Sequence, residues 1–165
     1  MRIFTPPSCA LDSLKYEERF FLAGSIEMGK AVDWQREFLF LMEKKYGGIN
    51  GPNVETCFYN PRRMDWDSTW TQSIENPQFY QQVSWEMDNL ERATHILFNF
   101  IPGTYSPISL LELGLFAHSA GKDKNVLVIC PEGFWRKGNV DIVCNRYNIP
   151  QETSIEGAVD YFLNH

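Results

Sequence analysis

Short, solid runs of apolar residues alternate along the chain with longer segments in which apolar residues recur every three or four positions. Runs of the first kind are typical of strands that are buried on both faces, and segments of the second kind are typical of amphipathic helices. The pattern predicts strands over residues 19–23, 56–59, 95–101 and 125–130. It predicts helices over residues 31–46, from residue 77 onward, over residues 106–120 and from residue 154 to about residue 163.

Two of the predicted helices begin with a capping pattern. Asn76 is a preferred N-cap residue, and Pro77 suits the first helical position because proline lacks the N–H that this position leaves unbonded. Thr153 and Glu156 have the spacing of a capping box, in which each side chain bonds to the backbone of the other residue. The helix after Pro77 is predicted to bury one apolar stripe, made of Phe79, Val83, Met87 and Leu90.

Buried strands that alternate with helices predict an α/β fold, a doubly wound parallel sheet with helices on both faces. We expect a single domain over residues 1–165, in which residues 1–17 form an irregular N-terminal extension. Folds of this class bind ligands beyond the carboxyl ends of the strands. The segments to inspect are therefore GSIE, NPRRMDWD and PGTYSPISLLE, which follow three of the predicted strands and are unusually polar.

The composition narrows the classes of function. Apolar residues make up 44% and charged residues 22% of the 165 residues, an ordinary globular profile that can bury a core without disulfides or metals. The formal net charge of −6 argues against a nucleic-acid-binding surface, which needs clustered Lys and Arg. A small polar ligand is easier to accommodate.

Cysteine spacing and hydropathy bear on cofactors and location. The chain has no C-x-x-C pair, so neither a zinc site nor a redox dithiol is indicated, and we expect no metal and no organic cofactor. No stretch approaches the roughly 18 apolar residues that a membrane helix requires. We therefore expect no membrane attachment and a cytoplasmic protein with reduced thiols. The cysteines are Cys9, Cys57, Cys130 and Cys144.

One carboxylate interrupts the apolar segment SPISLLELGLFA, which spans residues 106–117. Glu112 stands where an uncompensated charge is costly. One interpretation is structural: Ser109 and Glu112 fit S-x-x-E, so that Glu112 bonds back to the start of the helix. The other is chemical, because a carboxylate in the first turn is stabilised by the helix dipole and stays ionised when partly desolvated. The pattern leaves both open.

The chemical interpretation predicts a nucleophile. An ionised, poorly hydrated carboxylate at the mouth of the sheet is placed to attack the anomeric carbon of a sugar. That carbon develops oxocarbenium character in the transition state and is well matched to a nearby negative charge. Glu112 is therefore the first candidate for a catalytic residue.

A resemblance to a known family rests on four segments: FLAGSIE (residues 21–27), NPRRMDWD (60–67), QVSWEMDNLERA (82–93) and SPISLLELGLFA (106–117). Together they resemble the nucleoside 2-deoxyribosyltransferase superfamily, in its branch of nucleoside deoxyribosyltransferase-like proteins from bacteria and phages. The resemblance extends from about residue 19 to residue 147. The A-G-S turn combined with E-L-G in the helix is more specific than either motif alone.

The resemblance implies a flavodoxin-like fold and transfer of the 2-deoxyribosyl group between bases through a glycosyl ester on Glu112. Related members let water take the sugar instead and hydrolyse deoxynucleoside 5'-monophosphates. The family also places an acid in the helix before the third strand, where Glu86 fits better than its alternate, Asp88. The implied partner is a small-molecule deoxynucleoside or deoxynucleotide, no metal or cofactor is needed, and the protein is expected to be a homo-oligomer.

Two positions depart from the family pattern. Members often carry a Tyr where Phe21 stands, with a hydroxyl that contacts the catalytic Glu, and Tyr105 is a candidate to replace it. Several members have an Asp where this chain has Ser106, which favours a phosphate-binding Ser as in the monophosphate hydrolases. The loss of the Tyr hydroxyl also leaves open a catalytically inactive module that binds or senses nucleotides.

Other residues are predicted to bind substrate because they follow a strand or begin a helix. The backbone at Gly24 and the hydroxyl of Ser25 are suited to hold a phosphate or a sugar hydroxyl, and equally suit an ordinary turn. Ser109, near the start of the helix that carries Glu112, belongs to the same predicted set.

The NPRRMDWD segment has the chemistry of a base and phosphate site. Asp65 is suited to accept from a base edge, Trp66 to stack on a base, and Arg62 to pair with a phosphate, and Asn60 begins the segment. The competing interpretation is a surface loop with mutual salt bridges. Two further tryptophans, Trp34 and Trp85, lie on predicted helices and are expected in the core.

Overall fold

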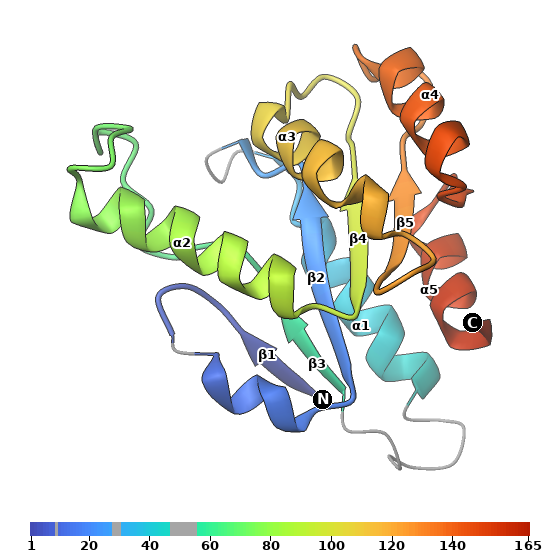
Figure 1. The fold of residues 1–165 in the computed structure, drawn as a ribbon, viewed down its shortest axis with the longest axis horizontal. Coiled ribbons are helices and arrows are strands. Elements are labelled where there is room, and N and C mark those ends of the chain that lie inside the picture. The colour runs from blue at the N-terminus through green and yellow to red at the C-terminus, as the bar shows by residue number, and fades with distance from the viewer. Residues whose placement is uncertain (9, 28–30, 47–55) are drawn as a thin grey trace.

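The computed structural model describes residues 1–8, 10–27, 31–46 and 56–165. Within these ranges six strands form one sheet in the order β1-β3-β2-β4-β5-β6, and every neighbouring pair runs parallel (Figure 1). If β1 is left out and the remaining strands are numbered from β2, their order is 2-1-3-4-5, which is the order of the flavodoxin-like doubly wound sheet. The predicted fold class is therefore confirmed. The strands are β1 (Arg2–Phe4), β2 (Glu18–Gly24), β3 (Thr56–Tyr59), β4 (His95–Asn99), β5 (Asn125–Ile129) and β6 (Gln151–Glu152).

Helices cover both faces of the sheet (Figure 1). One face packs against α1 (Trp34–Tyr46) and α5 (Ile155–Asn164). The other face packs against α2 (Pro77–Arg92), α3 (Pro107–Phe116) and α4 (Lys137–Tyr147). Two 3-10 segments, η1 (Leu11–Lys15) and η3 (Ala117–Ser119), lie on the same side as α2 to α4. The apolar faces of the helices therefore close a core on each side of the sheet.

The central strand β2 supplies side chains to both cores. Phe20 and Leu22 pack toward α1 and α5, whereas Phe21 and Ala23 pack toward α2 and α3. All four are at most 1% exposed. Because both faces need apolar residues, this strand appears in the sequence as an unbroken apolar run.

The N-terminal residues contradict one expectation. Residues 1–17 are not an irregular extension, because Arg2–Phe4 forms β1, which pairs with β3, and Leu11–Lys15 forms η1. β1 escapes the hydropathy pattern since it is three residues long and only Phe4 is buried. The sequence pattern also missed α4 and β6. The helix α4 is weakly amphipathic and buries only Val140 and Cys144.

The buried face of α2 differs from the predicted stripe. Val83 is 39% exposed, while the buried residues include the polar Gln82 and Asn89 beside Trp85. Asn89 Nδ2 donates to the Trp85 carbonyl at 2.7 Å. A polar side chain whose groups are bonded can be buried, so a stripe drawn from apolar residues alone misplaces the face.

One predicted cap is confirmed and the other is wrong. Asn76 caps α2, and its Oδ1 accepts from Phe79 N at 3.0 Å. The cap of α5 is Ser154, not Thr153, and its hydroxyl accepts from Gly157 N at 3.1 Å. The expectation that Trp34 and Trp85 belong to the core is confirmed, at 2% and 8% exposure.

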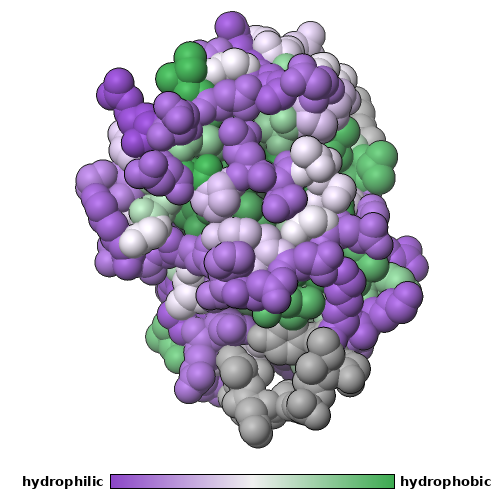
Figure 2. All heavy atoms as spheres, turned by 90° about the vertical axis from the view of Figure 1, so that its right-hand side faces the viewer, coloured by the Kyte–Doolittle hydropathy of each residue, from purple (hydrophilic) through white to green (hydrophobic). Residues whose placement is uncertain are grey.

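The surface over α4 and α5 is mostly hydrophilic, with separate hydrophobic spots (Figure 2). None of the helices in the described part of the chain combines the length and apolar content that crossing a bilayer requires.

Candidate active site

Two central strands, β2 and β4, end side by side at the carboxyl edge of the sheet. Gly24 is the last residue of β2 and has a φ of +139°, which a residue with a side chain rarely adopts. A Cβ at this position would lie 2.2 Å from the Asn99 carbonyl oxygen. Glycine therefore permits the close approach of the two strands from which the site is built.

A cluster of three hydroxyls joins the segment after β2 to the segment after β4. Ser25 Oγ lies 2.7 Å from Thr104 Oγ1 and 2.7 Å from Ser106 Oγ, and it accepts from Ile101 N at 2.9 Å. Ser25 is fully buried and Ser106 is 6% exposed. These hydroxyls bond to one another, so the structure does not present Ser25 or Ser106 as an open phosphate site.

The start of α3 holds a carboxylate of the chain itself. Glu27 Oε1 accepts from Tyr105 N and from Ser106 N, each at 2.8 Å. Backbone N–H groups at a helix N-terminus favour an anion. The anion at this position is the side chain of Glu27.

Glu112 lies in the second turn of α3 and is 5% exposed. The helix is capped at Ser106 and begins at Pro107, while Ser109 Oγ donates to the Gly24 carbonyl at 2.9 Å. The structural interpretation is therefore wrong, since Ser109 is not the cap, and the carboxyl lies beyond the first turn, in which the chemical interpretation had placed it. Burial and the neighbouring Glu86 carboxyl raise the pKa of Glu112 well above its usual value.

Glu86 reaches the same region from α2. Burial raises its pKa to about 7, and a hydrogen bond of 2.8 Å from Gln82 Nε2 to Glu86 Oε1 partly offsets that rise. Its alternate, Asp88, has a side chain that is 58% exposed and lies 3.5 Å from Arg92. The structure thus brings Glu86, and not Asp88, to Glu112.

The position of the missing family hydroxyl is filled by packing. Phe21 is 1% exposed, and its ring centroid lies 6.4 Å from that of Tyr59 and 6.3 Å from that of Trp85. Tyr105 is 66% exposed and packs on Trp135 at 5.5 Å. Tyr105 therefore supplies no buried hydroxyl in place of Phe21.

Arg62 is bonded within the protein instead of facing the site. Its guanidinium donates to Gln35 Oε1 at 2.8 Å and to the carbonyls of Ala31 and Val32 at 2.9 and 2.6 Å. It also lies 3.3 Å from Asp33. Arg62 ties the loop after β3 to the segment before α1, which does not support its predicted role at a phosphate.

The rest of the NPRRMDWD segment forms a set of local contacts. Arg63 pairs with the exposed Asp65 at 2.8 Å and lies over the ring of Trp70 at 4.9 Å. Trp66 packs on the same Trp70 ring, with centroids 5.2 Å apart. These contacts match the alternative of a surface loop with mutual salt bridges. Asn60 Oδ1 accepts from Arg62 N at 3.1 Å.

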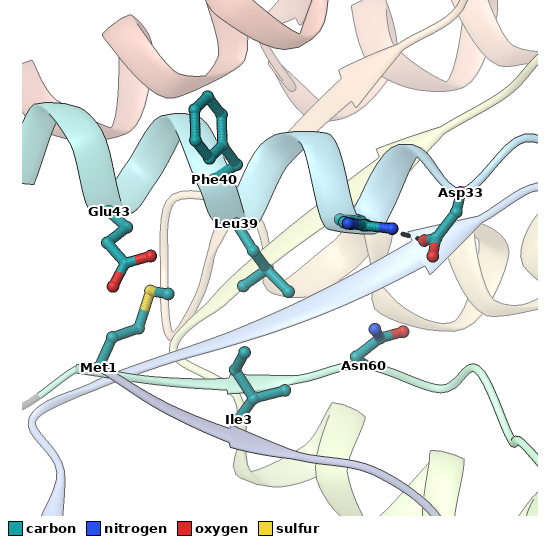
Figure 3. A pocket seen from close by; sticks show the side chains of 8 residues that line it. Met1, Ile3, Asp33, Leu39, Phe40, Glu43 and Asn60 are labelled. Carbon is teal, nitrogen blue, oxygen red and sulfur yellow. Dashed lines mark hydrogen bonds between the residues drawn. The ribbon is translucent and has the colours of Figure 1, made fainter.

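Two hollows of the molecule lie away from the carboxyl pair. The first has a volume of about 360 Å³ and lies between α1 and the edge strand β1 (Figure 3). Its wall includes Met1, Ile3, Phe40 and Asn60, so Asn60 faces a different region from Glu112. The second, of about 290 Å³, lies between α3 and α4. Neither is lined by Glu86 or Glu112.

Sequence reasoning missed two groups at this edge of the sheet, Gln82 and the carboxylate of Glu27. Gln82 stands four residues before Glu86, a spacing that places both on one face of a helix and gives a usable signal. Glu27 gave no such signal, because its partners Tyr105 and Ser106 are remote in sequence. Across the described ranges, no group of three or more His, Cys, Asp or Glu side chains is arranged to hold a metal ion.

Comparison with known families gives one match. A family model described as nucleoside 2-deoxyribosyltransferase like matches residues 17–134. That span runs from the residue before β2 to beyond β5 and includes Glu27, Glu86 and Glu112. A comparison with curated proteins finds no match.

Proposed function

Because the chain belongs to the nucleoside 2-deoxyribosyltransferase-like family, we propose that it transfers the 2-deoxyribosyl group of a deoxynucleoside from one base to another. The observation that carries the proposal is a pair of carboxyl groups with raised pKa values, the buried Glu112 from α3 and the half-buried Glu86 from α2, at the carboxyl edge of the sheet. Two carboxyls that share a site and repel each other are suited to hold one proton between them. The reaction needs that proton on Glu86, which leaves Glu112 ionised as the nucleophile, so it starts from a form of the pair that the raised pKa of Glu112 disfavours.

In the first step, a Glu112 oxygen attacks C1' of the sugar while the bond from C1' to the base nitrogen breaks. The electron pair of that bond stays on the base, and Glu86 delivers its proton to a ring nitrogen of the base. The products are a neutral base, a Glu86 carboxylate and a 2-deoxyribosyl ester on Glu112. Protonation of the leaving base and the negative charge on Glu112 both stabilise the oxocarbenium-like transition state.

In the second step, a ring nitrogen of the acceptor base attacks C1' and releases the Glu112 carboxylate. Glu86 takes the proton that the acceptor nitrogen loses, so the pair returns to its starting state. If water attacks in place of the base, the products are free 2-deoxyribose and the hydrolase reaction. The two outcomes share the ester and differ in the group that resolves it.

The environment of Glu27 supports an unphosphorylated substrate over a 5'-monophosphate. A phosphate in a fold of this class binds backbone N–H groups at a helix N-terminus. Directly before the first residue of α3, the backbone groups Tyr105 N and Ser106 N already bond to the Glu27 carboxylate. A phosphate there would meet a like charge, so the deoxynucleoside is the proposed substrate and the monophosphate the alternative.

The central experiment replaces Glu112 by Gln, which keeps the shape and removes the nucleophile. We expect Glu112→Gln to lower kcat/KM for base exchange by roughly 10³-fold or more. A 2'-fluoro-arabinosyl nucleoside slows resolution of the ester, because fluorine destabilises the second oxocarbenium-like transition state. Mass spectrometry should then find the sugar on a peptide that contains Glu112.

A matched control separates the two acids of α2. Asp88→Asn should leave kcat/KM within about threefold, since Asp88 lies at the exposed surface and pairs with Arg92. Glu86→Gln should lower it strongly. Full activity of Glu112→Gln, or a sugar attached to another residue, would show the assignment of Glu112 to be wrong.

A second candidate function is a nucleoside-binding module that has lost turnover. The buried Phe21 supports it, because no hydroxyl stands where the family often has one beside the catalytic Glu. Calorimetry that detects tight binding of a deoxynucleoside, combined with no cleavage and no ester, would favour this function over the transferase.

We also propose that the protein is a homo-oligomer in the cytoplasm. The outer side of α3 exposes Ile108, Leu111 and Leu115, at 58%, 60% and 53%. An apolar helix face of this kind is typical of a protein–protein interface. A reducing compartment is consistent with the buried free thiols of Cys57, Cys130 and Cys144.

A further inference from the structure

Gln82 is held in one orientation by two acceptors. Its Nε2 donates to the Pro61 carbonyl at 3.1 Å and to Glu86 Oε1 at 2.8 Å. Both partners are oxygens, so the nitrogen and the oxygen of the amide cannot be exchanged without losing both bonds. Gln82 is 4% exposed, and its orientation follows from these contacts.

The same contacts leave the amide oxygen without a donor. Among the described residues, none donates a hydrogen bond to Gln82 Oε1, which is buried. Buried polar atoms in folded proteins are nearly always bonded, and an exception calls for a specific explanation. This exception lies one helical turn from Glu86, the proposed acid, on the same face of α2.

We infer that Gln82 selects the base of the substrate: its Oε1 accepts a hydrogen bond from an exocyclic amino group, while Glu86 protonates the ring nitrogen beside that amino group. Glu86 Oε1 is bonded to Gln82 Nε2, so its other oxygen, Oε2, carries the proton to the base. The inference rests on the proposed function and adds a substrate class, the 2'-deoxynucleosides of amino bases.

Adenine and cytosine present this combination of groups. In adenine, N7 accepts a proton and the adjacent 6-amino group donates, and in cytosine N3 and the 4-amino group do the same. Hypoxanthine and uracil carry a carbonyl oxygen in place of the amino group. That oxygen would face Gln82 Oε1 with lone pair against lone pair, which penalises binding.

The experiment compares deoxyadenosine with deoxyinosine, which beside N7 differ only at this group, and deoxycytidine with deoxyuridine, which differ at this group and also at N3, where uracil carries a hydrogen. We expect wild-type protein to show kcat/KM at least about tenfold higher for deoxyadenosine than for deoxyinosine, and for deoxycytidine than for deoxyuridine. In Gln82→Met, which keeps the length and removes the acceptor, the ratio of deoxyadenosine to deoxyinosine should fall to about threefold or less, whereas the ratio of deoxycytidine to deoxyuridine should stay high, because N3–H of uracil still takes no proton from Glu86. A role confined to folding would lower the rates for amino and oxo bases alike and leave the ratios unchanged.

Gln35 offers a matched control. It is fully buried, its Oε1 accepts from Arg62 Nε, and its Nε2 has no partner among the described residues. It lies in α1, on the face of the sheet opposite to Glu86. Gln35→Met should lower thermal stability to a similar degree as Gln82→Met and keep the wild-type ratios.

The outcomes separate this inference from the proposed function. Equal kcat/KM for amino and oxo bases in the wild type would overturn base selection by Gln82 and leave the transferase standing. A ratio of deoxyadenosine to deoxyinosine that is unchanged in Gln82→Met would do the same, and would indicate that a buried water satisfies Oε1. Cleavage of none of the four nucleosides would overturn the proposed function and this inference together.

Discussion

Glu86 and Glu112 are placed where their charged forms are disfavoured. Each loses hydration on burial, and each repels the other when both are ionised. The shift of the Glu86 pKa from 4.5 to about 7 corresponds to a cost on the order of 3 kcal/mol for its ionised form. This cost lowers the stability of the folded protein, and it arises at the proposed catalytic site. Enzymes commonly lose stability at the site where they are active.

This cost predicts how stability depends on pH. In the unfolded chain Glu86 ionises above pH 4.5, whereas in the folded protein it keeps its proton up to about pH 7. The folded state therefore binds more protons in that window, and the contribution of Glu86 to the free energy of unfolding falls as pH rises through it. Glu86→Gln does not titrate, so it should match the wild type near pH 4.5 and be more stable at pH 8, by about 1–3 kcal/mol.

Urea denaturation at several pH values measures this difference directly. Asp88→Asn is the control, because it removes an acid of the same helix whose side chain is 58% exposed. If the difference between wild type and Glu86→Gln did not change between pH 4.5 and pH 8, Glu86 would not be desolvated in the folded protein.

Gly24 is a second single residue on which the site depends. Gly24→Ala should lower the free energy of unfolding by about 3 kcal/mol or more, because its Cβ meets the Asn99 carbonyl at 2.2 Å and its φ is +139°. Gly103 has a φ of +82° but open space around the position of a Cβ. Gly103→Ala should therefore cost only about 1 kcal/mol, and equal costs in the two variants would contradict the close approach of β2 and β4.

At the level of residues, the sequence identified the unusual carboxylate but misjudged its state. Glu112 was recognisable because hydropathy alone shows a charge inside an apolar helix. Its protonation depends on Glu86, which is 26 positions away along the chain, and no local pattern reports that contact. The bonding of Ser25 to Thr104 and Ser106 is likewise a product of strand pairing, so open phosphate-binding hydroxyls were predicted where the fold had already bonded them.

At the level of elements, the side chain of Glu27 connects the segment after β2 to the start of α3. Glu27→Ala removes a carboxylate that accepts two backbone hydrogen bonds. We expect it to lower stability by about 1–2 kcal/mol. We also expect kcat/KM for deoxyadenosine monophosphate, relative to deoxyadenosine, to rise at least about tenfold, because the repulsion of phosphate is lost.

Glu27→Gln serves as the matched variant. It keeps an acceptor oxygen for Tyr105 N and Ser106 N and removes only the charge, so it should recover most of the stability while still improving use of the monophosphate. Steady-state kinetics with both substrates measures the ratio. A wild-type protein that prefers the monophosphate would contradict exclusion of phosphate by Glu27.

Helices and strands could be predicted from the sequence where their buried residues are apolar. The strand at residues 56–59 was predicted with its observed bounds, because all four residues of β3 are buried and three of them, Cys57, Phe58 and Tyr59, are apolar or aromatic. In α2 the existence and the cap were predictable, but the buried face was not, since Gln82 and Asn89 are buried through hydrogen bonds that hydropathy does not register.

At the level of the whole molecule, α3 carries apolar side chains both on its buried side and on its exposed side. Leu113 packs in the core, while Ile108, Leu111 and Leu115 remain exposed on the outer side. Leu111→Glu should shift the sedimentation coefficient toward that of a monomer, because a charge opposes burial of this side at an interface. Sedimentation velocity at several concentrations tests it, with Ile142→Glu, an exposed site on α4, as control. A wild-type monomer at all concentrations would contradict the homo-oligomer.

The architecture was predictable because alternation of buried strands and helices permits few arrangements, and right-handed crossovers then determine the order of neighbours. The extra edge strand β1 was not predictable in the same way. It contributes one buried side chain and is recognisable only through its pairing with β3.

An all-parallel sheet also has a kinetic consequence for synthesis of the chain. Among the strands that the structure describes, none pairs with its immediate successor through a hairpin: Arg2 aligns with Cys57, and Phe20 aligns with both Phe58 and His95. As the polypeptide leaves the ribosome, tens of further residues must therefore be synthesised after β2 before the strands that pair with it emerge. Such non-local pairing slows folding. Until the neighbouring strands emerge, the apolar side chains of β2 are exposed to solvent or bound by chaperones. A nascent chain stalled before His95 should remain protease-sensitive, whereas one that includes both β6 and α5 should not.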